Sequence, residues 1–414
     1  MFRLEKVLEA FEKLPAEDVE WLKKTIYCMK CGFCRFVWAE NTPSAEYAYQ
    51  CPAGEHWKFE PYYASGKMEI CRELLLGNLD YTDKVMEILY TCTTCGNCKE
   101  NCNRAVKASP MDVIQEMRRR AFAAGKVFPS HRRLIEGLKN YGNPWFQPKA
   151  AREKWVKEMK EKGIKNANKE KVKVLYYVGC TAGVDPTMRR VAVATSKVLL
   201  AAGVDFGILG SEEVCCGSIY RRIGDEGTFR ELAEKNIKRF NELGVDTIVT
   251  ACAGCARTIM TEYPELADTY GEIKPRVVHV VQFVNELIKD KKLEIKKENN
   301  IHVTYHDPCH IGRHVGIYEP PREVINAIPG VKLTEMARNR DFSFCCGAGG
   351  GFRTQYLDVA LETAIKRVKE AEETGADYMI STCPFCYQNL SLGIQESKSR
   401  LQFRDLTEVL AEVV

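Results

Sequence analysis

The sequence has no long hydrophobic run and no large excess of charge of either sign. No stretch approaches the ~18 apolar residues that a membrane-spanning helix needs. Charged residues such as Lys6, Glu9 and Lys13 interrupt the apolar residues near Met1, which argues against a secretory signal peptide. The formal net charge of +4 over 414 residues is too small for the concentrated basic face of a nucleic-acid-binding protein. We therefore expect a cytoplasmic protein with no nucleic-acid partner; any position at the cytoplasmic membrane face would be peripheral, through a partner protein.

Cysteine is the residue in large excess, with 19 copies. A disulfide framework is typical of exported chains with an even number of cysteines. The adjacent pairs Cys215-Cys216 and Cys345-Cys346 would also bond to themselves only with strain. Metal binding in a reducing compartment therefore explains the cysteines better than disulfides do.

Two runs of the C-x2-C-x2-C type lie near the start of the chain, and each has a more distant fourth cysteine. In two-cluster ferredoxins the fourth cysteine of one run ligates the other cluster. We therefore assign one cubane 4Fe-4S cluster to Cys28, Cys31, Cys34 and Cys102, and a second to Cys92, Cys95, Cys98 and Cys51. Zinc, which prefers paired knuckles and four tetrahedral ligands, is the alternative and fits two triplets poorly. Cys71 is left over, and we expect a buried free thiol.

From residue 172 onward, expected strands and helices alternate in two similar halves. The expected strands are 172–178, 204–209 and 246–249, then 301–305 and 377–380; the expected helices are 188–202, 228–243 and 356–373. Cysteines in the two halves correspond at offsets of 129 to 131 residues, from Cys180–Cys309 to Cys252–Cys383. This is an internal duplication, expected to pack about a pseudo-twofold axis.

The sequence thus predicts a helical two-cluster ferredoxin domain followed by two duplicated α/β domains, in which βαβ units build parallel sheets. We place the helical domain at 1–130 and the α/β domains at 172–298 and 299–414. We place the linker between them at 131–171 and expect the charged, apolar-poor segment 149–173 to be a solvated helix.

Each α/β half carries five cysteines in the same pattern, and a glycine follows each adjacent pair. The first set is Cys180, Cys215, Cys216, Cys252 and Cys255; the second is Cys309, Cys345, Cys346, Cys383 and Cys386. Because these cysteines follow strands, they should gather at the carboxyl edge of each sheet, where open α/β sheets place ligands. We expect Gly217 and Gly347 to let the backbone approach a bulky cofactor. Five thiolates exceed the needs of one cubane or one zinc, which points to an unusual cluster and against structural zinc.

Both copies resemble the CCG domain, and the order of the parts resembles the D-type subunit of the heterodisulfide reductases of methanogens and related archaea. The resemblance rests on eighteen positioned cysteines and on surrounding residues such as Leu74–Gly77, Leu89–Cys95, Tyr305–His310 and Cys345–Gly351. It implies that each five-cysteine set holds a noncubane 4Fe-4S cluster. The ten cysteines would then form the catalytic centre, and the two clusters would cleave the disulfide that joins coenzyme M to coenzyme B.

Two functions remain open. In the first, the chain is part of a hetero-oligomeric complex, in which an electron-donor subunit similar to a flavoprotein or a membrane cytochrome b reduces the cubanes. The noncubane clusters then reduce this or a similar disulfide, or run the reverse reaction. In the second, the chain resembles the iron–sulfur subunits of flavin-dependent lactate, glycolate and glycerol-3-phosphate dehydrogenases, which pass electrons to a quinone. In several such subunits the second motif is eroded. Both motifs are complete here, which favours disulfide chemistry.

Histidines and arginines near the second motif give weaker signals. His306, His310 and His314 lie four residues apart, but Pro308 interrupts any helix, so a zinc-protease site is rejected. His306 and His310 flank Cys309, where a role beside a cluster competes with an ordinary structural one.

Two arginines, Arg313 and Arg353, also lie near the second motif. They are candidates for binding an acidic group, with an ordinary surface role as the alternative.

Overall fold

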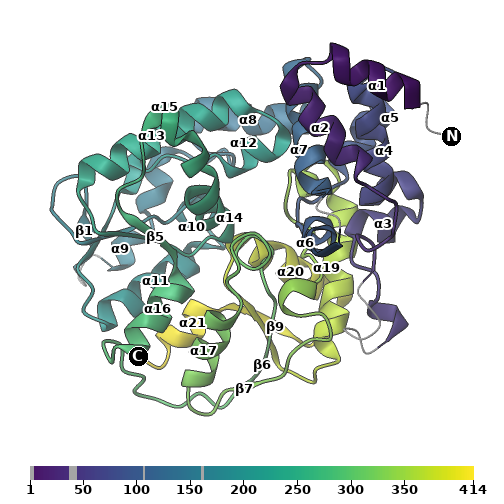
Figure 1. Cartoon of the computed structure of the whole chain (residues 1–414). Helices are drawn as coiled ribbons and strands as arrows, with labels where there is room; N and C mark the ends of the chain where they lie inside the picture. Colours follow the sequence, from purple (N-terminus) through teal and green to yellow (C-terminus); the bar gives the residue numbers. More distant parts are fainter. Residues whose placement is uncertain (1–3, 37–43, 106–107, 160–162) are drawn as a thin grey trace.

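The computed structural model describes residues 4–36, 44–105, 108–159 and 163–414 (Figure 1). The N-terminal region is helical, as predicted, and all of its helices except the last lie to one side of the α/β region. Its helices are α1 (Leu4–Lys13), α2 (Ala16–Ile26), α3 (Pro52–Trp57), α4 (Ala64–Leu75), α5 (Asp83–Tyr90), α6 (Asn97–Ala105), α7 (Pro110–Ala123) and α8 (Pro129–Tyr141). Among the described residues, none of the helices combines the length and the apolar character needed to cross a membrane.

The first α/β half contains a parallel sheet with strand order β1-β3-β2-β4-β5. Its strands are β1 (Lys165–Asn166), β2 (Val174–Tyr176), β3 (Phe206–Ile208), β4 (Thr247–Thr250) and β5 (Arg276–His279). Its helices are α9 (Val156–Met159), α10 (Cys180–Val184), α11 (Arg189–Ala201), α12 (Ser218–Ile223), α13 (Glu226–Leu243), α14 (Ala253–Arg257), α15 (Ala267–Tyr270) and α16 (Val280–Lys289). All three residues of β2 are buried, as expected of a strand covered on both faces.

The second half repeats the sheet in the order β7-β6-β8-β9, which is also parallel. Its strands are β6 (His302–Tyr305), β7 (Lys332–Leu333), β8 (Tyr378–Ser381) and β9 (Gln402–Asp405), and its helices are α17 (Glu319–Ala327), α18 (Phe352–Gln355), α19 (Leu357–Glu372), α20 (Pro384–Ser397) and α21 (Leu406–Ala411). This order matches β3-β2-β4-β5 of the first half strand for strand. The predicted parallel α/β fold is therefore confirmed.

One hydrophobic core runs through both halves. Leu199 in α11 and Val284 in α16 belong to the same buried cluster as Val324 in α17 and Leu410 in α21. Burial of large apolar side chains is worth about 1.5–3 kcal/mol each. This shared core holds the carboxyl ends of the two sheets in a fixed relation.

The prediction of a solvated linker helix before residue 172 is wrong for the described residues of that segment, which exclude 160–162. Trp155 is 1% exposed and belongs to the shared core, and Arg152 is buried in an ion pair with Glu213 at 2.7 Å. Lys165 pairs with Gly207 of β3, so the segment adds an edge strand to the first sheet. An edge strand is held by backbone hydrogen bonds and needs no pattern of apolar residues, so the sequence contains no signal from which this strand could be predicted.

Candidate metal centres

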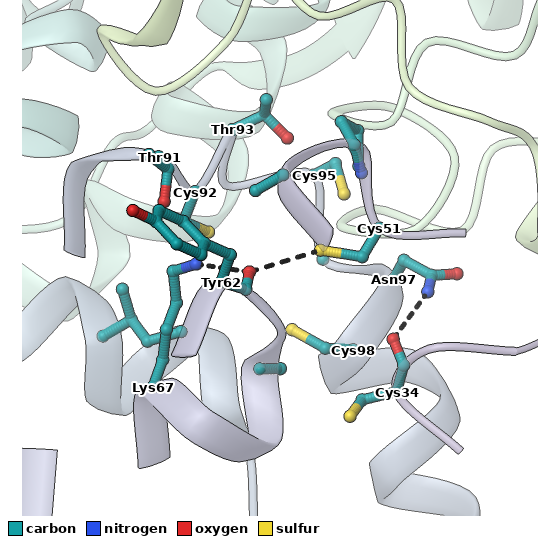
Figure 2. Close-up of a pocket in the computed structure, with 15 residues that line it drawn as sticks. Cys34, Cys51, Tyr62, Lys67, Thr91, Cys92, Thr93, Cys95, Asn97 and Cys98 are labelled. Atoms are coloured by element: carbon teal, nitrogen blue, oxygen red, sulfur yellow. Dashed lines mark hydrogen bonds between the residues drawn. The ribbon is translucent and has the colours of Figure 1, made fainter. Parts of the chain in front are cut away.

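Four cysteines predicted to share a cubane line one pocket in the helical region (Figure 2). Cys51 immediately precedes α3, Cys92 and Cys95 lie in the loop between α5 and α6, and Cys98 lies in the first turn of α6. Cys92, Cys95, Cys98 and Cys51 are called the inner ferredoxin site below. The structure thus brings together a cysteine triplet and a fourth cysteine that lies 41 residues before it.

A buried lysine indicates that the inner ferredoxin site suits an anionic group. Lys67 is 2% exposed, and its ammonium donates to the Tyr62 carbonyl oxygen at 2.5 Å. Burial lowers the pKa of Lys67, whereas the charges of Cys51 and Cys92 act in the opposite direction. Buried charges need partners of opposite sign. A cluster held by four thiolates supplies that partner, so these residues fit a cubane.

The other predicted ferredoxin cysteines lie next to the inner site. Cys34 and Cys102 are buried, Cys28 is half-buried and Cys31 is exposed. Burial raises the pKa of Cys102, and the nearby charges of Cys28 and Cys31 raise it further. Cys34 also lines the pocket of the inner site. This group, called the outer ferredoxin site, therefore links the molecular surface to the inner site.

Cys71, the remaining cysteine, is buried in α4, as predicted. Burial raises its pKa to about 12.

The two five-cysteine sets meet at a single cavity of about 90 Å³. Nine of the ten cysteines line it: Cys180, Cys215, Cys216, Cys252 and Cys255 from the first set, and Cys309, Cys346, Cys383 and Cys386 from the second. Each set comes from the carboxyl ends of its own sheet, as predicted. The cavity therefore brings together residues that are 129 to 131 positions apart in the sequence.

Within each set the thiols are close enough to change each other's acidity. Hydrogen bonds from Cys215 and Cys255 lower the pKa of Cys216 to about 6. In the second set, Cys386 Sγ lies 3.4 Å from Cys346 Sγ. Cys383 immediately precedes α20, whose N-terminus favours a thiolate there. Crowded, buried sulfur donors of this kind fit an iron–sulfur cluster.

Cys345, the tenth cysteine, faces the helical region instead of the cavity lining. A hydrogen bond with Cys345 lowers the pKa of Cys95 to about 5. Arg313 reinforces this contact, because its Nε donates to the Cys95 carbonyl oxygen at 2.8 Å and its Nη1 to the Ser343 carbonyl oxygen at 2.6 Å. The inner ferredoxin site therefore adjoins the second five-cysteine set directly.

The glycines that follow the cysteine pairs do not line the shared cavity. A Cβ on Gly217 would lie 3.0 Å from the ring of Phe229 in α13, and one on Gly347 would lie 2.7 Å from the Ala360 carbonyl oxygen in α19. Both glycines adopt positive φ, +82° and +86°. The prediction that they make room for a cofactor is wrong: they make room for the helix that covers the sheet.

Sequence reasoning missed Arg222 as a cavity residue, whereas it had named His310 as a candidate beside Cys309. Arg222 and His310 line the cavity, whereas Arg313 and Arg353 do not. Arg222 pairs with Glu262, yet its Nε and the Nε2 of His310 are buried without a hydrogen-bond partner in the described part of the chain. Nothing in the cysteine pattern marks Arg222, because the matching position of the second half holds no arginine.

Known families match both regions of the chain. The cysteine-rich domain family CCG matches residues 174–260 and 303–391, and the 4Fe-4S dicluster domain family matches residues 24–106. The matches support iron–sulfur clusters in this chain.

Three relatives are similar along most of its length. The D-type subunit of the dihydromethanophenazine:CoB–CoM heterodisulfide reductase of Methanosarcina barkeri is 37% identical over 79% of this chain and 78% of its own. The probable iron-sulfur-binding oxidoreductase FadF of Bacillus subtilis is 33% identical over 81% of this chain and 49% of its own. The EtfAB:quinone oxidoreductase of Syntrophomonas wolfei is 32% identical over 78% of this chain and 46% of its own. The chain is therefore an iron–sulfur electron-transfer subunit of an oxidoreductase and belongs to the family of the D-type subunits of heterodisulfide reductase.

Proposed function

We propose that the chain holds two cubane 4Fe-4S clusters at the two ferredoxin sites and one noncubane four-iron cluster at each five-cysteine set. The grouping of the thiols in sets of four and five supports this, as does the buried ammonium of Lys67 beside Cys51 and Cys92. The full complement would be about sixteen irons per chain. We propose domain boundaries at 1–130, 172–298 and 299–414, with the first α/β domain extended backward by its edge strand.

We further propose that the chain reduces a disulfide, or runs the reverse reaction, in the cavity shared by both five-cysteine sets. That shared cavity is the observation that carries the proposal. When bound, the clusters supply electrons singly, and two of them at one cavity match the two electrons that a disulfide takes up. Because the Methanosarcina relative is named for a CoB–CoM heterodisulfide, that disulfide or a similar one is the substrate we infer.

The cavity residues fit a substrate with an acidic group. Arg222, which lines the cavity, and Arg257, which lines a neighbouring pocket, both pair with the carboxylate of Glu262. This arrangement leaves positive charge and an unpaired Arg222 Nε in the site. An acidic group on the substrate would complete the pairing. His310, beside it, would border the sulfur atoms of the bound disulfide.

Electrons would enter where the outer ferredoxin site reaches the surface at the exposed Cys31. Two of the relatives are named as part of a reductase or as an oxidoreductase with another electron carrier. We infer a hetero-oligomeric complex in which the donor is a flavoprotein or a cytochrome b-like membrane subunit. The chain itself would be cytoplasmic.

A second candidate is an iron–sulfur subunit that passes electrons from a flavoprotein dehydrogenase to a quinone. The name of the Syntrophomonas relative favours it. In this role the shared cavity would bind no thiol.

Thiol binding separates the two functions. The full chain, purified anaerobically and oxidised, is treated with coenzyme M, coenzyme B or cysteine, and its electron paramagnetic resonance (EPR) spectrum is recorded. Disulfide chemistry predicts a new cluster signal with at least one thiol. The signal should vanish in Cys215→Ser and Cys346→Ser variants but persist in Cys51→Ser. Silence with every thiol, in protein with full iron content, favours the quinone-linked role.

A further inference from the structure

Equivalent positions near the two five-cysteine sets hold different side chains. Tyr177 lies three residues before Cys180, and His306 lies three residues before Cys309. Both are buried. The hydroxyl of Tyr177 donates to the Val214 carbonyl oxygen at 2.5 Å. The two sets therefore differ in a polar group close to their sulfur atoms.

The imidazole of His306 lies among the sulfur atoms of the second set. One ring nitrogen and the sulfur atoms of Cys346 and Cys386 all lie within 4.8 Å of one another. Hydrogen bonds from Cys345, Cys386 and His306 lower the pKa of Cys346 well below its usual value. In the first set, Tyr177 makes no such contact among the described residues. The second set thus has a nitrogen donor where the first has none.

A second difference fixes which nitrogen of His306 carries the proton. Arg367 lies 16 residues before Cys383, and Asn236 lies 16 residues before Cys252. Arg367 is 0% exposed, and its Nε donates to His306 Nδ1 at 3.2 Å. Asn236 instead donates to the Cys215 carbonyl oxygen at 3.0 Å.

Arginine is always a donor and never an acceptor. His306 Nδ1 must therefore be the unprotonated nitrogen, and Nε2 must carry the ring proton. A protonated Nε2 cannot ligate a metal, although it can donate to a thiolate. Arg367 is itself held in place, because its Nη1 donates to Glu370 at 2.7 Å and its Nη2 to Ser343 Oγ at 3.3 Å. The tautomer is thus set by a rigid, buried neighbour.

We propose that His306 is a positioning residue that donates a hydrogen bond from Nε2 to the Cys346 sulfur and raises the reduction potential of the second four-iron cluster above that of the first. The inference rests on the proposed cluster at that set. Hydrogen bonds to cluster sulfurs stabilise the more negative, reduced state. Because Cys345 of the same set adjoins Cys95, electrons from the inner ferredoxin site would reach the higher-potential cluster first.

The test is an EPR-monitored redox titration of the full chain, with the iron content measured in parallel. His306→Phe removes the donor and keeps a ring, whereas His306→Gln keeps an N–H near the position of Nε2. Tyr177→Phe is the matched control at the first set. A Cys215→Ser background, which disrupts the first set, assigns the signal of the second.

His306→Phe should reduce the equilibrium constant for one-electron reduction of the second cluster about tenfold, a shift of about 59 mV to lower potential. His306→Gln should restore most of that shift, and Tyr177→Phe should leave the second cluster unchanged. Equal potentials in the wild type and His306→Phe overturn the inference, as does an equal shift in the Tyr177→Phe control.

If His306→Phe loses iron, the Arg367→Met variant tests the inference instead. This variant keeps the imidazole of His306 but frees its Nδ1 to take the proton. The reduction potential of the second cluster should then fall by less than in His306→Phe, and an unchanged potential refutes the inference. Wild-type protein with far fewer than sixteen irons would refute the proposed clusters themselves. Protein with four clusters in which the potential of the second cluster is the same with and without His306 would refute only the role of His306.

Discussion

Replacing Arg118 should destabilise the contact between the helical region and both α/β halves. Arg118 in α7 is 0% exposed and donates to the carbonyl oxygens of Leu89, Cys92, Arg222 and Gly350, at 2.6 to 3.2 Å. Cys92 belongs to the inner ferredoxin site, whereas Arg222 lies in the first half and Gly350 in the second. The Arg118 side chain therefore contacts the helical region and both α/β halves.

The size of the effect follows from these bonds. Arg118→Met leaves four carbonyl groups without this donor, at about 1–3 kcal/mol for each buried group left unsatisfied. Removing a buried charge recovers part of its desolvation energy, so we expect a net loss of about 4 kcal/mol. With an unfolding entropy of about 2.1 cal/mol/K per residue, this lowers the Tm of the 414-residue chain by about 4–5 °C.

The assay is thermal unfolding of the iron-loaded chain, followed by circular dichroism at a fixed scan rate. Arg119→Met is the matched control, because Arg119 lies next in α7, is 39% exposed and pairs with Glu116, which Arg120 also contacts. A partly exposed ion pair is worth about 1 kcal/mol or less, and Arg120 keeps Glu116 paired, so the control should lower Tm by about 1 °C or less. Equal shifts in the two variants would refute the role given to Arg118.

Three further predictions concern pH, substrate and iron. Burial lowers the pKa of His131 to about 4, so its contribution to the free energy of unfolding is present above pH 6.5 and is lost as the pH falls toward 4. Unfolding measured between these pH values should show this decrease in stability, and His131→Gln should make the decrease smaller. Arg222→Met should raise KM for an acidic disulfide roughly tenfold in steady-state assays, whereas Arg221→Met, outside the shared cavity, should not; an equal change in both would contradict the assigned contact. Cys71→Ala should keep the full iron content, whereas Cys51→Ala should lose about four irons per chain, as iron analysis would show.

The sequence was sufficient to predict the features that depend on local spacing. Cysteine triplets such as Cys92, Cys95 and Cys98 are close in the chain, so their spacing alone predicts a shared site. The duplicated strands were recognisable because the same pattern of strands and cysteines recurs 129 to 131 residues later, with each cysteine after the corresponding strand. The parallel order of the two sheets followed from the alternation of strands and helices.

Contacts between distant segments could not be predicted in this way. Cys95 and Cys345 are 250 positions apart, and no periodicity relates them. The same holds for Arg222, which reaches the cavity through the packing of α12, and for the edge strand at Lys165, which is held by backbone bonds. The role of Gly217 was misjudged because the sequence does not reveal which neighbour occupies the space beside a glycine.

The central claim is that two four-iron clusters face each other across one cavity. The most direct measurement is an anomalous-scattering map at the iron edge from crystals of the anaerobically purified chain. Besides the irons of the two ferredoxin sites, the account predicts two groups of four iron positions, one beside Cys215 and Cys216 and the other beside Cys345 and Cys346. A single zinc ion at either set, or a disulfide within either pair, would contradict it.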